Sequence, residues 1–316
     1  MSKMYNLQLF AELNTQTTGT GTLSPEMKVF YSDYLIDNAV PKLVHDQFGQ
    51  KHPIPKNGGK TIEFRKYSPL PKLLTPLTEG VTPDGQSLTV TTVEATVAQY
   101  GGYITLSDVL LLTAIDNNMV QATKLLGNQA GATLDTITRE VLNGGTNVIY
   151  SGGVASRSAL ADNLTVDDVK KAARALKTQN AEKIGDSFVA IIHPDVSYDL
   201  TNDPKWEAVK TYDPKDWYEG EIGRIGGVRF VETTEAKIFD GGVYSTLVLA
   251  ENAYGVTEIE GGGLQHIVKQ LGSAGTADPL DQRATVGWKA IKVAERLVEQ
   301  FMVRIESKCT FDGAAN

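Results

Sequence analysis

The sequence predicts an α+β protein, and three observations lead to that class. Residues 58–107 alternate apolar and polar side chains around a proline-rich middle, as in a long β-hairpin. Apolar residues recur every three or four positions between 117 and 142, which predicts one long amphipathic helix. Strand-like runs and helix-like patterns then mix between about 160 and 260, which is typical of a compact α/β or α+β unit.

Length and composition are those of a folded protein. The chain has 316 residues, enough for about two domains. Hydrophobic residues make up 41% and charged residues 22%, so the chain can bury a core. A formal net charge of -8 disfavours charge-driven binding to nucleic acids or acidic membranes, because such binding needs clustered Lys and Arg.

Cysteine content and hydropathy argue against a disulfide-linked, a cysteine-based metal-binding or a membrane-spanning protein. Cys309 is the single cysteine, so we expect no intrachain disulfide and no cysteine-based metal site. Residues Met1–Ala11 lack the charge and length of a signal peptide, and no run of about 18 apolar residues predicts a spanning helix. We therefore expect a protein that is made in the cytosol and stays there unless it is released or packaged.

Before the hairpin the sequence predicts one helix. Asn14–Thr22 is almost wholly polar and predicts a surface segment. Ser24–Asn38 has helix signals, with Ser24 as the capping residue and Pro25 at the first helical position. Asp46–Gly59, which is polar and contains prolines, is expected to link this helix to the hairpin.

The hairpin is expected to consist of two long limbs and an irregular tip. Thr61–Tyr67 alternates as a half-buried strand does. The prolines that follow remove backbone donors, so the tip can be neither helix nor central strand. The chain is expected to turn at Pro83–Gly85 and return through Ser87–Leu106. In this returning limb the apolar residues change from even to odd positions near Thr91–Thr92, which predicts a bulge or a sharp twist.

A hairpin of this length needs a surface to lie on. An isolated two-stranded hairpin is marginally stable in water, and we expect its partner to be a second copy of the chain. The predicted contact residues are the apolar ones along the limbs and tip: Ile62, Phe64, Tyr67, Leu70, Leu73, Leu74, Leu77, Val81, Leu88 and Val90.

Two helices are expected after the hairpin. Ser107 is placed to cap a short apolar segment, Val109–Leu112. The long helix is expected over Asn117–Leu142, about 40 Å at ~1.5 Å per residue, and Gly144–Gly145 is expected to end it. Its narrow apolar stripe suits a helix that lies across a sheet.

The compact unit shows local signals for both element types. Thr165–Asp168 has the pattern of a helix N-terminus. Phe188–Ile192 predicts a buried strand, and His193–Asp195 is expected to break it and start a short helix. Further strands are expected at Val228–Val231 and Ser245–Ala250.

The C-terminal part is expected to return as strands. Gly261–Gly263 marks the predicted exit from the compact unit. Arg283–Lys289 and Phe301–Ser307 predict two strands, and the connection Ala290–Gln300 fits either a strand or a helix.

No catalytic, cofactor-binding or metal site is predicted. Gly59–Thr61 is similar to the end of a phosphate-binding loop, but Ile54 stands where that loop needs glycine, and a strand follows instead of a helix. His193 and Asp195 are better explained as a strand-to-helix corner, because acid–base catalysis needs further converging groups. An α/β enzyme centred on Ile192–Asp195 is the least favoured alternative.

An aromatic group predicts a second candidate contact surface. The stretch Asn202–Gly223 is polar, and exposed aromatic side chains favour an interface, with local burial as the alternative. The four residues are Trp206, Tyr212, Trp217 and Tyr218.

Five segments carry a family resemblance: Met4–Ala11, Gly59–Phe64, Leu77–Pro83, Gln99–Ile104 and Asp278–Lys289. In this order and spacing they resemble the major capsid proteins of tailed bacteriophages with the HK97-type fold, and more specifically the N4-like major capsid protein family. The resemblance spans nearly the whole chain and contains no catalytic signature.

The resemblance implies an HK97-like capsid fold with five parts. These are an N-terminal arm (1–57), an extended β-hairpin arm or E-loop (58–107), a peripheral domain with a long spine helix (108–159), an α/β axial domain (160–265), and return strands of the peripheral β-sheet with the C-terminus (266–316). It implies a structural, non-enzymatic subunit that self-assembles through pentamers and hexamers into the icosahedral head shell of a virion.

The resemblance also implies partners. The shell would enclose double-stranded DNA through weak non-specific contact, would assemble in the host cytoplasm, and could meet scaffolding, portal or decoration proteins, but no membrane or cofactor. The second-ranked alternative is an encapsulin-like bacterial nanocompartment shell, which would enclose proteins instead of DNA.

Overall fold

The computed structural model describes residues 15–16, 43–56, 59–67, 70–77, 79–80, 82, 84–113, 118–206, 223–257, 262–273, 275, 278–311 and 313–316. The chain divides into two compact units. The first comprises Met1–Val44, Gln99–Asp135 and Gly261–Lys292, and the second comprises His45–Ala98, Thr136–Glu260 and Val293–Asn316. The predicted exit at Gly261–Gly263 therefore coincides with a division between units.

The first unit contains a sheet of long strands. Its strands are β1 (Thr15–Gln16), β5 (Ala98–Ser107), β13 (Gln265–Lys269) and the first part of β14 (Arg283–Arg296). β14 neighbours both β5 and β13, and β1 pairs parallel with β5. The strands approach closely at Gly287, where a Cβ atom would lie 2.8 Å from the Cβ of Tyr103.

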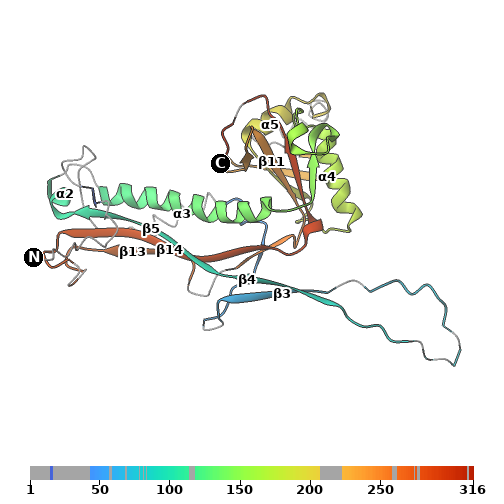
Figure 1. The fold of residues 1–316 in the computed structure, drawn as a ribbon, viewed down its shortest axis with the longest axis horizontal. Coiled ribbons are helices and arrows are strands. Elements are labelled where there is room, and N and C mark those ends of the chain that lie inside the picture. The colour runs from blue at the N-terminus through green and yellow to red at the C-terminus, as the bar shows by residue number, and fades with distance from the viewer. Residues whose placement is uncertain are drawn as a thin grey trace, which may run out of the picture. The chain divides into compact units, whose positions relative to one another are not determined.

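Helix α3 (Asn118–Asn143) runs along this sheet, as Figure 1 shows for the part that belongs to the first unit. The Trp288 indole donates to Gln129 Oε1 at 3.2 Å, and Lys292 Nζ donates to the Leu134 carbonyl at 2.9 Å. The helix buries the predicted stripe, which in this unit is Met119, Ala122, Leu126, Ala130 and Leu134. The long predicted helix and its position on a sheet are confirmed.

The short helix α2 (Asp108–Thr113) precedes α3. Ser107 Oγ accepts a hydrogen bond from the Leu110 amide at 3.2 Å, which is the predicted cap. The predicted helix Ser24–Asn38 lies outside the described residues. No helix in the described ranges is long and apolar enough to cross a membrane.

The second unit is organised around a seven-stranded mixed sheet. Its main path is β6-β15-β11-β7-β9-β8, and β10 pairs with β11. β7 pairs parallel with β9 and β6 with β15, while β11 is antiparallel to both β7 and β15. The strands are β6 (Val148–Tyr150), β7 (Phe188–Ile192), β8 (Arg224–Ile225), β9 (Val228–Glu232), β10 (Ile238–Phe239), β11 (Val243–Leu249) and β15 (Met302–Ser307).

Two helices pack on this sheet, and both begin where the sequence predicts a helix start. α4 (Val166–Thr178) begins after Thr165, whose hydroxyl oxygen accepts from the Asp168 amide. α5 (Pro194–Thr201) begins after His193, whose Nδ1 accepts from the Asp195 amide at 3.2 Å. The core between helices and sheet includes Val169, Leu176, Ile192, Val248 and Val303, all fully or almost fully buried.

Short elements complete the second unit. β2 (Gln50–Lys51) pairs parallel with β12 (Tyr254–Thr257), and β12 pairs antiparallel with the last part of β14. Single turns of 3-10 helix lie at Ser151–Gly153, Arg157–Ala159 and Glu299–Phe301.

Arginine side chains hold the C-terminal end of α3. The helix ends before Gly144–Gly145, as predicted. Arg304 Nη1 donates to the Gly145 carbonyl at 3.0 Å and also to the Asn143 carbonyl. A positive charge therefore lies at the negative end of the helix dipole.

A buried carboxylate neutralises this arginine. Glu306 is fully buried, and its Oε1 accepts from Arg304 Nε at 2.9 Å. Arg157 donates to both Glu306 oxygens, at 2.6 and 2.7 Å. Hydrogen bonding to Glu306 raises the pKa of Arg157, whereas burial lowers the pKa of Arg304. This triad ties β15 to the end of α3 and to the turn at Arg157–Ala159.

Two predictions about strands require correction. The sequence predicts Met302–Ser307 as one of the return strands (266–316) of the peripheral sheet. In the structure this segment is β15, which belongs to the seven-stranded sheet because its backbone pairs with β11 and β6. The bulge expected near Thr91–Thr92 is also wrong, since pairing there is unbroken. The ambiguous connection Ala290–Gln300 is a strand to Arg296, where β14 ends.

Candidate subunit interface

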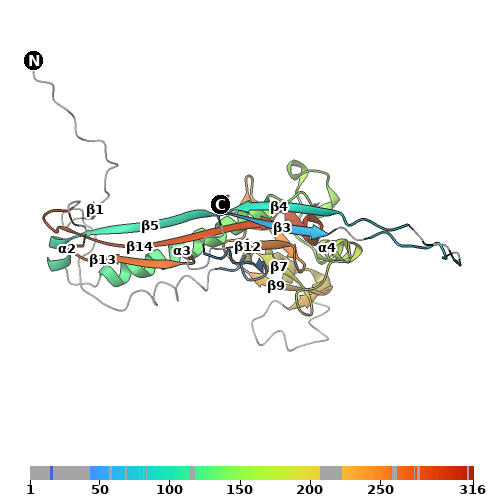
Figure 2. The ribbon, with the colours of Figure 1, turned by 90° about the horizontal axis from the view of Figure 1, so that it is seen from below.

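The hairpin arm is a two-stranded ribbon within the second unit. β3 (Thr61–Tyr67) pairs antiparallel with β4 (Val90–Thr96), in register from Thr61↔Thr96 to Tyr67↔Val90. At its base the Val97 amide donates to the Lys60 carbonyl at 2.9 Å. Figures 1 and 2 show the two limbs continuing beyond these strands, away from the base.

The base of the arm packs against its own chain. The Phe64 ring meets the His52 ring edge-on, with centroids 5.8 Å apart. Phe64 also lies over Gly255, where a Cβ would be only 3.0 Å from Cζ of the ring. Ala95 and Val97 on the returning limb are 4% and 8% exposed. The base is therefore an anchor, and the half-buried Ile62 and Phe64 owe part of their burial to this chain.

The distal part of the arm is exposed. Residues 70–77 and 84–89 form neither helix nor strand. The predicted contact residues there are uncovered: Leu70 51%, Leu73 79%, Leu74 85%, Leu77 75%, Leu88 69% and Val90 43% exposed. The side chains of Tyr67 and Val81 lie outside the described residues. Six of the predicted contact residues are thus exposed, four on the outgoing limb and two on the returning limb of the arm.

The aromatic candidate surface requires a correction. Trp206 is 3% exposed and packs edge-on against Phe230, with ring centroids 5.5 Å apart. Its side chain belongs to the core of its own unit, where it contacts Phe230 of β9, and is not available to a partner. Tyr212, Trp217 and Tyr218 lie outside the described residues.

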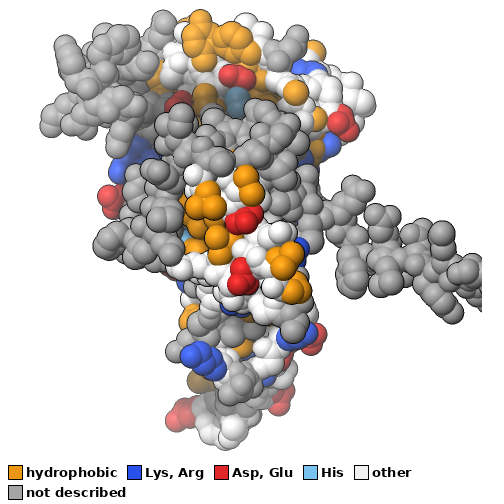
Figure 3. Space-filling view, turned by 90° about the vertical axis from the view of Figure 1, so that its left-hand side faces the viewer, with side chains coloured by type: hydrophobic (Ala, Val, Ile, Leu, Met, Phe, Trp, Pro, Cys, Tyr) orange, Lys and Arg blue, Asp and Glu red, His pale blue; other side chains and the backbone are white. Residues whose placement is uncertain are grey.

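Sequence reasoning missed an exposed apolar group in the first unit. Val109 and Leu112 of α2 are 49% and 82% exposed, and Leu271 and Leu280 are 40% and 75% exposed. Figure 3 faces this end of the first unit, and hydrophobic side chains are visible there between charged ones. The available signal was the run of apolar residues Val109–Leu112, since one short helix cannot bury four consecutive side chains.

The corner at His193 is a structural feature. Its ring packs 5.2 Å from that of Tyr244, between centroids, and the Tyr244 hydroxyl donates to Asp195 Oδ2 at 2.8 Å. Burial lowers the pKa of His193. Both predicted corner residues are thus engaged, since His193 caps α5 and Asp195 accepts a hydrogen bond from the buried Tyr244.

Other candidate chemistry is also accounted for. Burial raises the pKa of Cys309 to about 12, so its thiol is protonated and a poor nucleophile near neutral pH. Within the described ranges no group of three His, Cys, Asp or Glu side chains is placed to hold a metal ion.

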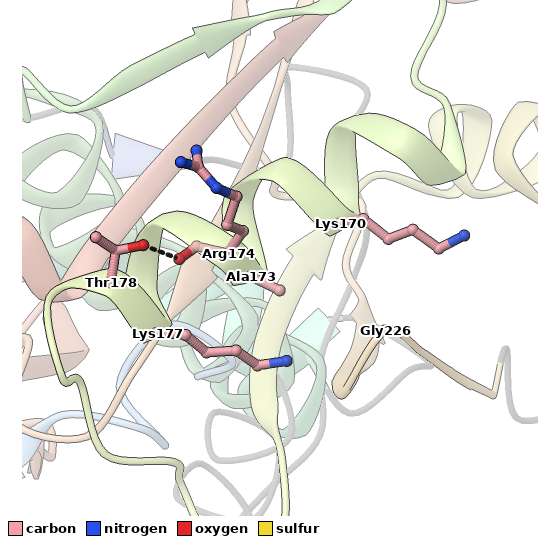
Figure 4. Close-up of a pocket in the computed structure, with 6 residues that line it drawn as sticks. All are labelled: Lys170, Ala173, Arg174, Lys177, Thr178 and Gly226. Atoms are coloured by element: carbon pink, nitrogen blue, oxygen red, sulfur yellow. Dashed lines mark hydrogen bonds between the residues drawn. The ribbon is translucent and has the colours of Figure 1, made fainter.

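One hollow of about 600 Å³ lies over α4 (Figure 4). Lys170 and Lys177 extend from the helix on the side of Gly226, and Thr178 donates to the Arg174 carbonyl at 2.9 Å. Its lining has three cations but no carboxylate, histidine or cysteine. Such a lining offers no general base for catalysis near neutral pH.

The exposed apolar arm is therefore the main candidate site in the described residues, and it is a contact surface and not a pocket. The chain belongs to the phage capsid protein family: the sequence model described as "Phage capsid protein" matches residues 90–296, which is more than half of the chain. None of the curated proteins compared with the chain matches it.

Solved phage capsids have a similar fold. The capsid of the cyanophage P-SCSP1u aligns with a TM-score of 0.67 and 14% identity, over 93% of both chains. The capsid of cyanophage Pam1 aligns at 0.66 and 16%, over 94% of this chain and 99% of that chain. The capsid of Ralstonia phage GP4 aligns at 0.65 and 15%, over 85% and 89%.

Family and fold together give the function. The fold is the α+β, HK97-like fold of phage capsids. The protein is a structural major capsid protein, which assembles with copies of itself into the head shell of a phage and is located in the virion capsid.

Proposed function

We propose that this shell is the icosahedral head of a tailed phage, built from pentamers and hexamers, and that the hairpin arm of each subunit lies on a neighbouring copy. The single observation that carries the proposal is the unpartnered arm. Its base is anchored by Phe64 over Gly255, whereas Leu73, Leu74 and Leu77 are at least 75% exposed.

The energetics favour an intersubunit role for the arm. A two-stranded ribbon is marginally stable alone, and burying a leucine side chain contributes about 1.5–3 kcal/mol relative to leaving it exposed. Contiguous exposed apolar surface of this kind marks interaction sites. Repeated in every subunit, such moderate contacts add up because the subunits in a closed shell are held together at several sites at once.

The parts of the chain are assigned roles on the same basis. We assign 1–57 to an N-terminal arm, 58–107 to the E-loop, and α3 with the sheet of the first unit to the peripheral domain. The seven-stranded sheet with α4 and α5 is assigned to the axial domain. The exposed apolar group at Val109, Leu112, Leu271 and Leu280 is a second candidate contact surface.

The same proposal covers the finer identity and the partners. The five sequence segments that resemble N4-like major capsid proteins support membership of that branch. The cargo is double-stranded DNA, held by weak contact because the net charge of -8 disfavours tight binding. Assembly in the host cytoplasm, with scaffolding, portal or decoration proteins, completes the proposal, and no enzymatic step is assigned to the chain.

The test is the particle formed by the purified protein. Light scattering and negative-stain microscopy under native conditions should show shells, or rings of five and six. DNA in phage-produced particles supports a phage head, whereas a protein cargo with a docking peptide supports an encapsulin-like nanocompartment. A stable monomer with measurable turnover would instead support an enzyme.

A deletion separates the arm from the rest of the subunit. Removing Pro69–Gly85 should leave a folded, soluble subunit that assembles poorly, because the described leucines of this segment are at least half exposed. Circular dichroism checks folding and light scattering checks assembly. A subunit that unfolds on deletion would show that the arm acts within its own chain.

A further inference from the structure

A groove lies at the base of the arm, entirely within the second unit. It has a volume of about 490 Å³. Its floor is apolar and only half-buried, formed by Ile62, Phe64, Val93, Leu297 and Val298. Its other lining residues are mostly polar: Gln50, His52, Pro53, Glu63, Arg65 and Asn252. The groove therefore leaves apolar side chains partly in contact with water, where a partner could cover them.

The tip of the same arm cannot fill this groove. Ile62, Phe64 and Val93 lie on the paired strands, and the ribbon runs in register as far as Tyr67 and Val90. The exposed leucines come after that point. From Phe64 to Leu74 the chain has ten residues, about 33 Å if extended. Both limbs lead away from the base in Figures 1 and 2, so a tip that reaches the groove has to come from another chain.

We propose that the groove receives the arm tip of a second copy of this protein, with Leu73, Leu74 and Leu77 seated on its apolar floor. The inference rests on the proposed function and adds to it the place where the tip docks. Both surfaces are incomplete alone: the floor side chains are half-buried, and the three leucines are 79%, 85% and 75% exposed. Contact between them removes apolar area from water on both sides.

The polar rim suits the chemistry of the tip. Leu70–Leu77 forms no regular element and bends at Thr75, and Pro71 and Pro76 lack backbone donors. Its other amide and carbonyl groups would need protein partners once a groove excludes water from them. Gln50, His52 and Asn252 offer exposed side-chain donors and acceptors along the groove. A proline-containing peptide held in a groove lined by aromatic and apolar side chains is a common recognition mode.

The geometry makes the contact head-to-tail. Tip and groove lie at opposite ends of one hairpin, so each copy gives a tip to one neighbour and accepts a tip from the other. A contact of this heterologous kind closes into a ring when the rotation between copies allows it. Rings are what the proposed capsomers require.

The test is site-specific crosslinking between copies. One subunit carries Leu74→Cys and a second carries Gln50→Cys, on the rim of the groove. The two are mixed, allowed to assemble and treated with a short bis-maleimide. The native Cys309 should react slowly with the reagent, because burial raises the pKa of its thiol to about 12. Wild-type protein and a mixture with Lys177→Cys, on the exposed face of α4, are the matched controls.

The expected result is a covalent dimer in the mixture of Leu74→Cys with Gln50→Cys, at least fivefold more abundant than in either control. A chain with both changes should give a ladder of covalent oligomers. If shells form but no tip-to-groove product appears, the inference is overturned and the groove has another occupant, while the proposed function stands. If neither shells nor rings form from wild-type protein, the proposed function fails as well.

Discussion

Replacing the exposed leucines of the arm tip should abolish assembly without unfolding the subunit. The perturbation is the triple change Leu73→Ser, Leu74→Ser and Leu77→Ser. Their side chains are 75–85% exposed, so the subunit loses almost no buried area. Surface changes of this kind alter stability by about 0.5 kcal/mol or less each.

The loss should appear between subunits. Burying three leucines contributes about 4–9 kcal/mol to each arm contact as an upper range, and the serines forfeit most of it. Even the lower value corresponds to an affinity loss of about a thousandfold. Many contacts act together in a shell, so the concentration needed for assembly should rise steeply.

The assay measures light scattering against protein concentration, with denaturant unfolding of the unassembled subunit in parallel. The matched control replaces the same three leucines with methionine, which keeps the segment apolar and should preserve assembly. The reasoning is refuted if the serine variant assembles at the wild-type concentration, or if it unfolds at a lower denaturant concentration than the methionine variant.

Three further predictions concern the subunit itself. Glu306→Gln should lower the free energy of unfolding by about 3–5 kcal/mol, because two arginines lose their buried counter-charge. The control Glu94→Gln, on the exposed arm, should change the free energy of unfolding little. Equal effects of the two changes in denaturant unfolding would contradict the account. Burial lowers the pKa of His193 from 6.5, so the unfolded chain binds the proton first, and thermal stability should fall as pH drops from 7 through the lowered value. His193→Asn, which can still cap α5, should reduce that fall, and an unchanged pH profile would disprove the role. Gly287→Ala should lower the free energy of unfolding by about 1–3 kcal/mol, because the added methyl group overpacks against the neighbouring strand. The control Gly85→Ala, in open space, should leave the free energy of unfolding unchanged. Similar calorimetric midpoints for the two variants would contradict close packing at Gly287.

Local sequence signals predicted the elements well. The alternation of Thr61–Tyr67, the apolar stripe of α3, the caps at Ser107 and Thr165 and the helix start after His193 all depend on residues close in sequence. Propensity, capping and periodicity are encoded within a few residues, so they can be recognised without tertiary information. The exposed leucines of the tip were predicted for the same reason, since prolines prevent that segment from entering a sheet.

Long-range pairing could not be predicted in the same way. The apolar run of Met302–Ser307 fits any buried strand, and only its pairing with β11 and β6 places it in the seven-stranded sheet. Trp206 has the sequence surroundings of an exposed loop but is buried against Phe230, which lies 24 positions later in the chain. The apolar phase change near Thr91 indicated a bulge or a sharp twist, whereas the pairing there is unbroken and Leu88 and Val90 are exposed.

The division of the arm into base and tip also needed the structure. Ile62 and Phe64 carry the same strand signal as residues farther out, and their anchoring depends on His52, Gly255 and Leu297, which are distant in sequence. The groove at the base arises from the same distant residues.

The most direct test of the central claim is a reconstruction of the assembled particle by electron cryomicroscopy. The claim is that the arm is anchored at its base by its own chain and covered at its tip by another. The reconstruction should show Leu73, Leu74 and Leu77 buried against a neighbouring copy, with Phe64 still over Gly255 of its own chain. Tips that stay in solvent, or that fold onto their own subunit, would contradict it.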